Sequence, residues 1–135
     1  MALSPAIRSA IVTQHNQLRS SLAKGLEPTV RGENAPSGKN IYKLSYDCKL
    51  EAQAQKWSNE CTFQHSNIAL RNASENLFWA WGNDISAVTT IPKAISWWWN
   101  ELSLIGISDP QNRLTFDVFR SGVGHFTAVW MLPFF

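Results

Sequence analysis

The chain has 135 residues, the size of one domain, and its 44% hydrophobic and 16% charged residues can build a buried core, which excludes a largely disordered protein. Twelve basic and ten acidic residues give a formal net charge of +2 without a basic cluster, so nucleic-acid binding is not expected. No apolar run reaches the roughly 20 residues of a membrane span, and no transmembrane segment is expected.

Three helices are predicted in chain order. The first covers residues 5–23, where Ser4 can cap the helix and apolar positions recur on one face, with His15 placed among them as a core or helix-anchoring residue. The second covers residues 47–60, which are rich in helix formers, with Asp47 as the N-cap. The third is expected to begin at Pro92, because proline suits a first helical turn, and to run to about residue 102.

The strand signal comes late in the chain. Residues 26–40 are rich in proline and glycine and are expected to form a loop, and residues 76–81 read as a strand or an ordered loop. Residues 126–131 have strand composition. Helices followed by a late strand predict the α+β class, and no repeat or interdomain linker divides residues 1–135.

Cys48 and Cys61 are not expected to bond to each other. If the residues between them are helical, the two cysteines lie roughly 20 Å apart, whereas a disulfide needs Cα atoms within about 7 Å. Two readings stay open: both are buried or free thiols, or each pairs with a cysteine that this chain does not contain.

Four polar residues are candidates for chemistry. His65 and His125 lie in polar or glycine-flanked contexts, while Glu75 and Glu101 each lie beside aromatic residues. Two imidazoles with two carboxylates suit a divalent metal such as zinc, since imidazole nitrogen is a zinc ligand and carboxylates orient it. Their spacing matches no local ligand motif, so the residues alone do not decide between a site and four unrelated side chains.

Five motifs, in this order, resemble those of one family, the CAP superfamily of cysteine-rich secretory, antigen 5 and pathogenesis-related 1 proteins. They are the segments 15–19, 61–66, 74–78, 98–101 and 124–130. The stretch 46–51 is most similar to the nematode venom-allergen-like and activation-associated secreted proteins. The resemblance covers residues 7 to about 131.

The resemblance implies an α-β-α sandwich with a central antiparallel sheet and a large cleft. In the family, residues matching His65, Glu75, Glu101 and His125 line the cleft, and the two histidines bind a divalent cation, often zinc. Tryptophans 79, 81 and 97–99 are expected to frame this cleft. Family members are secreted, and some bind sterols or other lipids.

The chain departs from the family pattern in three places. Ser74 stands where glycine is usual and creates the sequon Asn72-Ala73-Ser74, a candidate N-glycosylation site. Ala128 replaces a glutamine beside the expected site. Residues 131–135 stand in place of the family's later strands and cysteines. The resemblance therefore implies a C-terminally shortened CAP domain, whose late cysteines would have been the partners of the two here.

A shortened sheet would leave an exposed C-terminal strand through which the chain could self-associate. The function expected from the resemblance is a secreted, non-enzymatic effector or binding protein that engages a host protein or a sterol or other lipid and modulates immunity. Residues 1–5 do not form a signal peptide, so either the chain is cytosolic or a targeting segment lies outside this sequence, and the resemblance implies the second. Two alternatives remain: a metal-assisted hydrolase with Glu75 or Glu101 as general base, and a truncated form without independent activity.

Overall fold

The computed structural model describes residues 3–131, with side chains through residue 130. Within this range the β-structure is one antiparallel bridge, between Pro28 and Asn34, and segments 26–40 and 76–81 are otherwise loops. The helices are α1 (Pro5–Ala23), α2 (Cys48–Ser58), α3 (Ile68–Arg71), α4 (Ala87–Leu104), α5 (Phe116–Val118), the π-helical turn η1 (Phe119–Val123) and α6 (Gly124–Met131).

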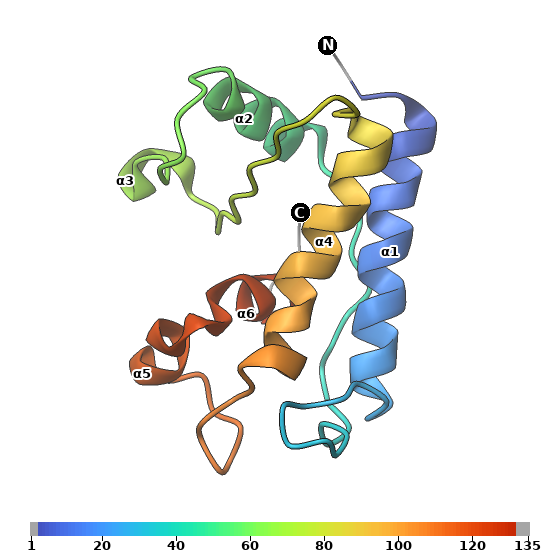
Figure 1. Ribbon diagram of the computed structural model, residues 1–135, viewed down its shortest axis with the longest axis vertical. Helices are drawn as coiled ribbons and strands as arrows, with labels where there is room; N and C mark the ends of the chain where they lie inside the picture. Colours follow the sequence, from blue (N-terminus) through green and yellow to red (C-terminus); the bar gives the residue numbers. More distant parts are fainter. Residues whose placement is uncertain (1–2, 132–135) are drawn as a thin grey trace.

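Two long helices form the frame of the molecule. Helices α1 and α4 lie side by side and run in the same direction, and α6 packs against the C-terminal half of α4 (Figure 1). Helices α2 and α3 lie toward the end where α4 begins, whereas α5 and α6 lie toward the end where it finishes. This arrangement places the loops between α2 and α4 beside the start of α6.

The first helix has the bounds that the sequence predicts. The Ser4 hydroxyl accepts a hydrogen bond from the Ile7 N–H at 3.3 Å, and Pro5 occupies the first turn. Gly25 ends the helix with a φ of +70°, which glycine adopts without strain. His15 is buried, and its Nδ1 lies 2.8 Å from the Ile11 carbonyl, so its predicted anchoring role is confirmed.

The core lies where α1, α4 and α6 meet. The rings of Trp99 on α4 and Phe126 on α6 contact edge to face, with centroids 5.1 Å apart. Leu102 and Val129 belong to the same buried cluster between these two helices, and Leu22 of α1 also belongs to it. Burial of these side chains is the main stabilising contribution to the fold, because each removes apolar surface from water.

The second helix and its flanking cysteines also agree with the sequence. Asp47 caps α2, where its Oδ1 accepts from the N–H groups of Lys49 at 2.6 Å and Leu50 at 3.3 Å. Cys48 and Cys61 are both free and exposed, which confirms that they do not bond to each other. Of the reading that they are buried or free thiols, the second form is the one observed.

The third helix begins five residues earlier than predicted. Ser86 and Thr89 form a capping box at its start, so Ala87 is the first helical residue and Pro92 lies inside the helix. A proline within a helix leaves the carbonyl four residues earlier without its partner. That residue, Val88, is 67% exposed, so water can reach this part of the helix and solvate the carbonyl.

The predicted strand at residues 126–131 is wrong, because these residues belong to α6. Phe126 and Val129 are buried three positions apart, which fits a helical face packed on α4 rather than the alternation of a strand. Gly122, with a φ of +104°, bends the chain just before the helix. Since a helix bonds its backbone internally, residues 124–131 offer no strand edge, and the self-association expected through such an edge is not supported. Residues 132–135 lie outside the described range.

Candidate functional site

Glu75 lies in the loop after α3 and accepts hydrogen bonds through both carboxylate oxygens. His65 Nδ1 donates to Oε1 at 2.8 Å, and a carboxylate can only accept, so this nitrogen carries the hydrogen. Ser66 donates from its backbone N–H at 2.9 Å and from its hydroxyl at 2.8 Å. Arg71 Nη1 adds an ion pair at 2.9 Å. The carboxylate is therefore fully engaged in holding His65.

These bonds also set the ionisation of the carboxyl group. Burial by itself would raise the pKa of Glu75, because it disfavours the charged form. Hydrogen bonds from Ser66 and His65, together with the charge of Arg71, outweigh this and hold the pKa of Glu75 below its usual value. Glu75 is thus an anion that orients the imidazole.

Helices α2 and α3 hold Arg71 in place. The Asn67 side chain caps α3 by accepting from the Ala69 N–H at 2.9 Å, and Arg71 ends this helix. The backbone carbonyl of Arg71 accepts a hydrogen bond from Gln53 Nε2 of α2 at 2.7 Å. The side-chain Nε of Arg71 donates to the Ala73 carbonyl at 2.9 Å. The loop that carries His65 and Glu75 is therefore tied to α2.

The second pair joins α4 to α6. His125 Nδ1 donates to Glu101 Oε1 at 2.6 Å, and the Phe126 N–H donates to Glu101 Oε2 at 2.9 Å. Glu101 thus caps the first turn of α6 while it orients His125, and a carboxylate at a helix N-terminus is favoured by the helix dipole. The Trp98 ring stacks on the imidazole at 6.3 Å between centroids and 17° between planes.

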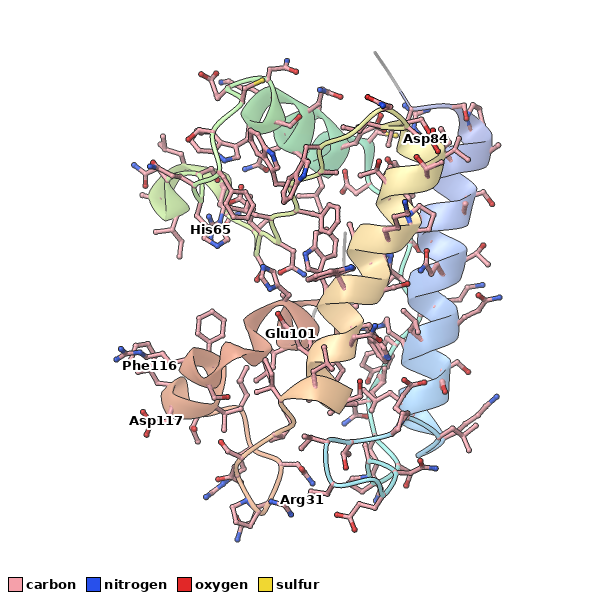
Figure 2. The ribbon with its side chains drawn as sticks, viewed as in Figure 1. Arg31, His65, Asp84, Glu101, Phe116 and Asp117 are labelled. Carbon is pink, nitrogen blue, oxygen red and sulfur yellow. The ribbon has the colours of Figure 1, made fainter. Side chains whose placement is uncertain are left out.

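The two pairs are linked through the loop that follows Glu75. Asn76 Nδ2 donates to the His125 carbonyl at 3.0 Å, and Trp98 Nε1 donates to the Leu77 carbonyl at 3.0 Å. Figure 2 shows His65 beside α3 and Glu101 between α4 and α6. The structure therefore pairs each of the two candidate histidines with one of the two candidate glutamates. Within the described residues, no cluster of three or more His, Cys, Asp and Glu side chains could hold a metal ion.

Each imidazole keeps one nitrogen available. His65 and His125 are 54% and 38% exposed at their side chains. With Nδ1 bonded to a carboxylate, the lone pair of a neutral ring lies on Nε2, which accepts no hydrogen bond from any described residue. This is the carboxylate–histidine arrangement in which imidazole acts as a metal ligand.

Comparison with known proteins identifies the family. The profile of CAP, the cysteine-rich secretory protein family, matches residues 12–130. The chain belongs to the CAP family. A match of this length covers nearly all the described residues and includes both histidine–glutamate pairs.

Relatives of this CAP chain are secreted proteins of nematodes and venoms. It is 36% identical over 129 residues to the Ancylostoma secreted protein of Ancylostoma caninum, covering 93% of this chain and 30% of that protein. It is 32% identical over 143 residues to Venom allergen 3 of Solenopsis invicta, covering 96% of this chain and 56% of that protein. The chain therefore spans less than two thirds of these relatives.

Solved structures show the same fold. BmVAL-1 superposes with a TM-score of 0.86 at 37% identity, covering 94% of this chain and 64% of that one. NaASP2 with Zn2+ gives a TM-score of 0.86 at 32% identity, covering 95% of this chain and 68% of that one. The predicted α+β fold of the CAP sandwich is thus confirmed, although residues 124–131 are helical here. No helix within residues 3–131 is long and apolar enough to cross a membrane.

Several residues that build the CAP site escaped the sequence interpretation. Ser66, Arg71 and Asn76 hold the histidine–glutamate pairs, but serine, arginine and asparagine in loops are too common to signal such a role. Their closeness in sequence to His65 and Glu75 is the one sequence signal for such a role. The tertiary contacts alone show that Asn76 reaches across to α6.

The tryptophans of this CAP chain divide into two groups. Trp98 stacks on His125 and Trp99 lies in the core, so these two lie at or beneath the site. Trp79, Trp81 and Trp97 are exposed, Trp81 to 83%. The expectation that all of them frame one cleft is therefore wrong for the core Trp99 and stays a prediction for the others.

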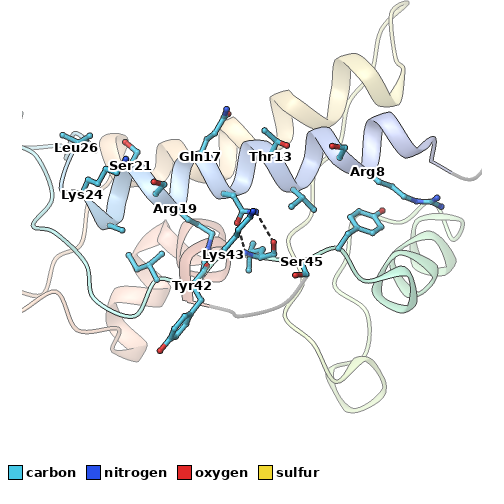
Figure 3. A pocket seen from close by; sticks show the side chains of 18 of the residues that line it. Arg8, Thr13, Gln17, Arg19, Ser21, Lys24, Leu26, Tyr42, Lys43 and Ser45 are labelled. Atoms are coloured by element: carbon cyan, nitrogen blue, oxygen red, sulfur yellow. Dashed lines mark hydrogen bonds between the residues drawn. The ribbon is translucent and has the colours of Figure 1, made fainter.

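A groove of about 1230 Å³ lies elsewhere on the CAP chain. It is bounded by one face of α1 and by residues 41–46, as Figure 3 shows, and contains none of the four site residues. Asn16 of α1 fixes segment 41–46 by two hydrogen bonds to the Leu44 backbone, at 3.0 and 2.7 Å. Hydroxyl, amide and basic side chains such as Thr13, Gln17 and Lys24 make up much of its lining.

Proposed function

We propose that this CAP chain acts outside the cell as a non-enzymatic binding protein whose His65 and His125 bind a divalent cation of the zinc type. The observation that carries the proposal is the shared geometry of the two histidines. Each donates Nδ1 to a glutamate, at 2.8 Å and 2.6 Å, and each leaves Nε2 to face a ligand.

The donor set fits a cation that takes only part of its coordination from the protein. Zinc accepts imidazole nitrogen, and a carboxylate on the other ring nitrogen makes that ligand more basic. Glu75 and Glu101 use both oxygens in hydrogen bonds, so they orient the imidazoles rather than bind the ion. A bound cation would supply an electrophilic anchor for a carbonyl or carboxylate of a partner.

Binding is favoured over catalysis by the state of the two carboxylates. A general base needs a carboxylate oxygen free to take a proton from water. The pKa of Glu75 lies below the usual value, which makes its carboxylate a weaker base, and both carboxylates are held in place by hydrogen bonds from protein donors. The hydrolase alternative therefore has no observation in its favour.

Titration calorimetry with zinc chloride tests the metal part. Wild type should bind zinc, and His65→Ala and His125→Ala should each weaken binding at least tenfold, because each removes a ligand. Gln64→Ala is the matched control, since Gln64 is an exposed neighbour whose side chain makes no hydrogen bond within the described residues. Absence of zinc binding by wild type, or equal loss in the control, would contradict the proposal.

The same titration separates the site from a purely structural role. A ligand that binds only the folded chain raises its unfolding temperature. If the two pairs merely hold the fold together, zinc leaves that temperature unchanged and the two alanine variants only lower it. We expect zinc to raise it in wild type and not in His125→Ala.

The finer part of the proposal concerns the partner. The secreted nematode and venom relatives support a role as an effector toward host tissue, with a host protein or a sterol or other lipid as the target and immunity as the process modulated. For a lipid, the exposed Trp79, Trp81 and Trp97 offer apolar surface, and these side chains are the basis of the test. In a flotation assay, wild type should rise with cholesterol-containing vesicles and Trp81→Ala should not, while Leu104→Ala, at another exposed apolar position, serves as the control.

A further inference from the structure

We propose that Asn72 carries an N-linked oligosaccharide, attached beside the His65–Glu75 pair. Asn72-Ala73-Ser74 is the one Asn-X-Ser/Thr sequon in the sequence. The inference rests on the extracellular location in the proposed function and is independent of metal binding.

The fold presents the acceptor side chain to solvent. Asn72 ends α3 in the left-handed region, with φ 43° and ψ 32°, a conformation that asparagine tolerates better than most residues. Asn72 and Ser74 are both exposed. Neither side chain makes a hydrogen bond to any residue within 3–130, so an added sugar displaces no contact of these two groups.

The residues on either side of Asn72 are held firmly. Arg71 donates to the Ala73 carbonyl at 2.9 Å and accepts at its own carbonyl from Gln53 at 2.7 Å. The same guanidinium binds Glu75 at 2.9 Å. A glycan on Asn72 therefore extends from a loop fixed to α2, next to the carboxylate that orients His65.

The surface around Asn72 includes exposed apolar side chains that a glycan would cover. Ile68 and Leu70 of α3 are 76% and 82% exposed, which is high for apolar side chains placed two residues apart. Asn72 follows directly on the same short helix. A hydrated oligosaccharide at this position would shield these side chains from other molecules.

The attachment is a group transfer whose co-reactant is an oligosaccharide linked to a polyprenyl pyrophosphate. The Nδ2 atom of Asn72 forms a bond to C1 of the first sugar and loses one proton to the transferring enzyme. The bond between C1 and the phosphate oxygen breaks, and the polyprenyl pyrophosphate leaves with the electron pair. No oxidation or reduction takes place.

The test expresses the full 135-residue chain behind a secretion leader in insect cells. Intact mass spectrometry should show wild type above the polypeptide mass by one oligosaccharide. Peptide-N-glycosidase should remove this increment without denaturant, since Asn72 is exposed, and convert Asn72 to aspartate. Ser74→Ala should lose the increment completely, whereas Ser74→Thr should keep it.

Mass is read in both the medium and the cell lysate, so poor secretion does not hide the result. A wild-type chain at the bare polypeptide mass, in cells that glycosylate a co-expressed glycoprotein, would overturn the proposal. An increment that survives in Ser74→Ala, or that is removed only after denaturation, would overturn the assigned site or its exposure. Zinc titration of the enzyme-treated protein then tests the metal site separately, because neither result depends on the other.

Discussion

Asn76 donates a 3.0 Å hydrogen bond from its side chain to the backbone carbonyl of His125, 49 positions later in the chain. Because Asn76 directly follows Glu75, this bond joins the loop that holds His65 to the helix that carries His125. The relative position of the two histidines therefore depends on a residue that belongs to neither pair.

Replacing Asn76 by alanine should weaken zinc binding about tenfold, as loss of groups that support a ligand does. The reason is that both histidines remain but their relative position loosens. Calorimetry would measure this. Asn100→Ala is the control, since Asn100 is exposed and its side chain makes no hydrogen bond in the described part of the chain. Unchanged affinity in Asn76→Ala would show that the two histidines bind ions separately.

Glu101→Gln should lower both zinc affinity and stability. Glutamine offers one acceptor oxygen where Glu101 uses two, so either His125 Nδ1 or the Phe126 N–H loses its partner. We expect a loss of about 1 kcal/mol in unfolding free energy and a 10- to 100-fold weaker affinity, roughly. Glu60→Gln, the same change at an exposed residue whose side chain makes no hydrogen bond to any described residue, should leave both quantities as in wild type.

Arg19 should prove essential to the fold. The residue is 3% exposed, and its guanidinium donates to the carbonyls of Tyr42, Val129 and Trp130 at 2.6–2.9 Å. The latter two end α6, where helix carbonyls lack partners. Arg19→Ala should lower the urea unfolding free energy by about 3 kcal/mol, because buried acceptors are left unpaired. Arg19→Lys should keep only part of the unfolding free energy that Arg19→Ala loses, since an ammonium group lacks the several coplanar N–H donors of a guanidinium.

An exposed arginine serves as the comparison for that measurement. Arg31 is exposed and its side chain makes no hydrogen bond within the described residues, so Arg31→Ala should stay within about 0.5 kcal/mol of wild type. Equal unfolding free energies for Arg19→Ala and Arg31→Ala would contradict the prediction, because water would then replace the Arg19 guanidinium without loss of stability.

Asp109 should titrate at unusually low pH. Hydrogen bonds from the Arg113 side chain and backbone, and from the Gln111 N–H, lower the pKa of Asp109 from 3.8 to about 2. The carboxylate therefore stabilises the folded state above its ordinary pKa, and this contribution is lost as pH falls through about 2. A carboxyl-carbon NMR titration should show this midpoint. Arg113→Gln should move it upward, and an unmoved midpoint would contradict the assignment.

The two cysteines should react as independent thiols. Both are free and exposed, so the folded chain should take up two equivalents of a thiol reagent without denaturant. Cys48→Ser and Cys61→Ser should each take up one. Uptake that appears only after reduction would show that the thiols are bonded in the isolated protein.

Local signals in the sequence were sufficient for the first two helices. Ser4 and Asp47 are capping residues, and each acts within three residues of its own position, so short-range chemistry fixes where those helices begin. The first-turn preference of proline is misleading at α4, because Pro92 lies inside that helix. Ser86 and Thr89 form the stronger local signal, because together they satisfy the first free backbone groups of the helix.

The C-terminal segment shows why composition can mislead. Residues 126–131 combine valine, threonine and aromatic side chains that favour strands, yet they form a helix. Packing of Phe126 and Val129 on α4, together with the Glu101 cap, outweighs that intrinsic preference. Neither influence is visible in the segment itself, because both partners lie more than twenty residues earlier.

The family, the four candidate site residues and the sequon can be read from the linear sequence, since each rests on the identity and order of side chains. How those residues pair is seen in the folded chain alone. His65 meets Glu75 and His125 meets Glu101 because the loop before α3 and the start of α6 bring the histidines onto carboxylates 10 and 24 positions away. Such contacts depend on how helices pack in space, and a linear order of residues does not contain that information.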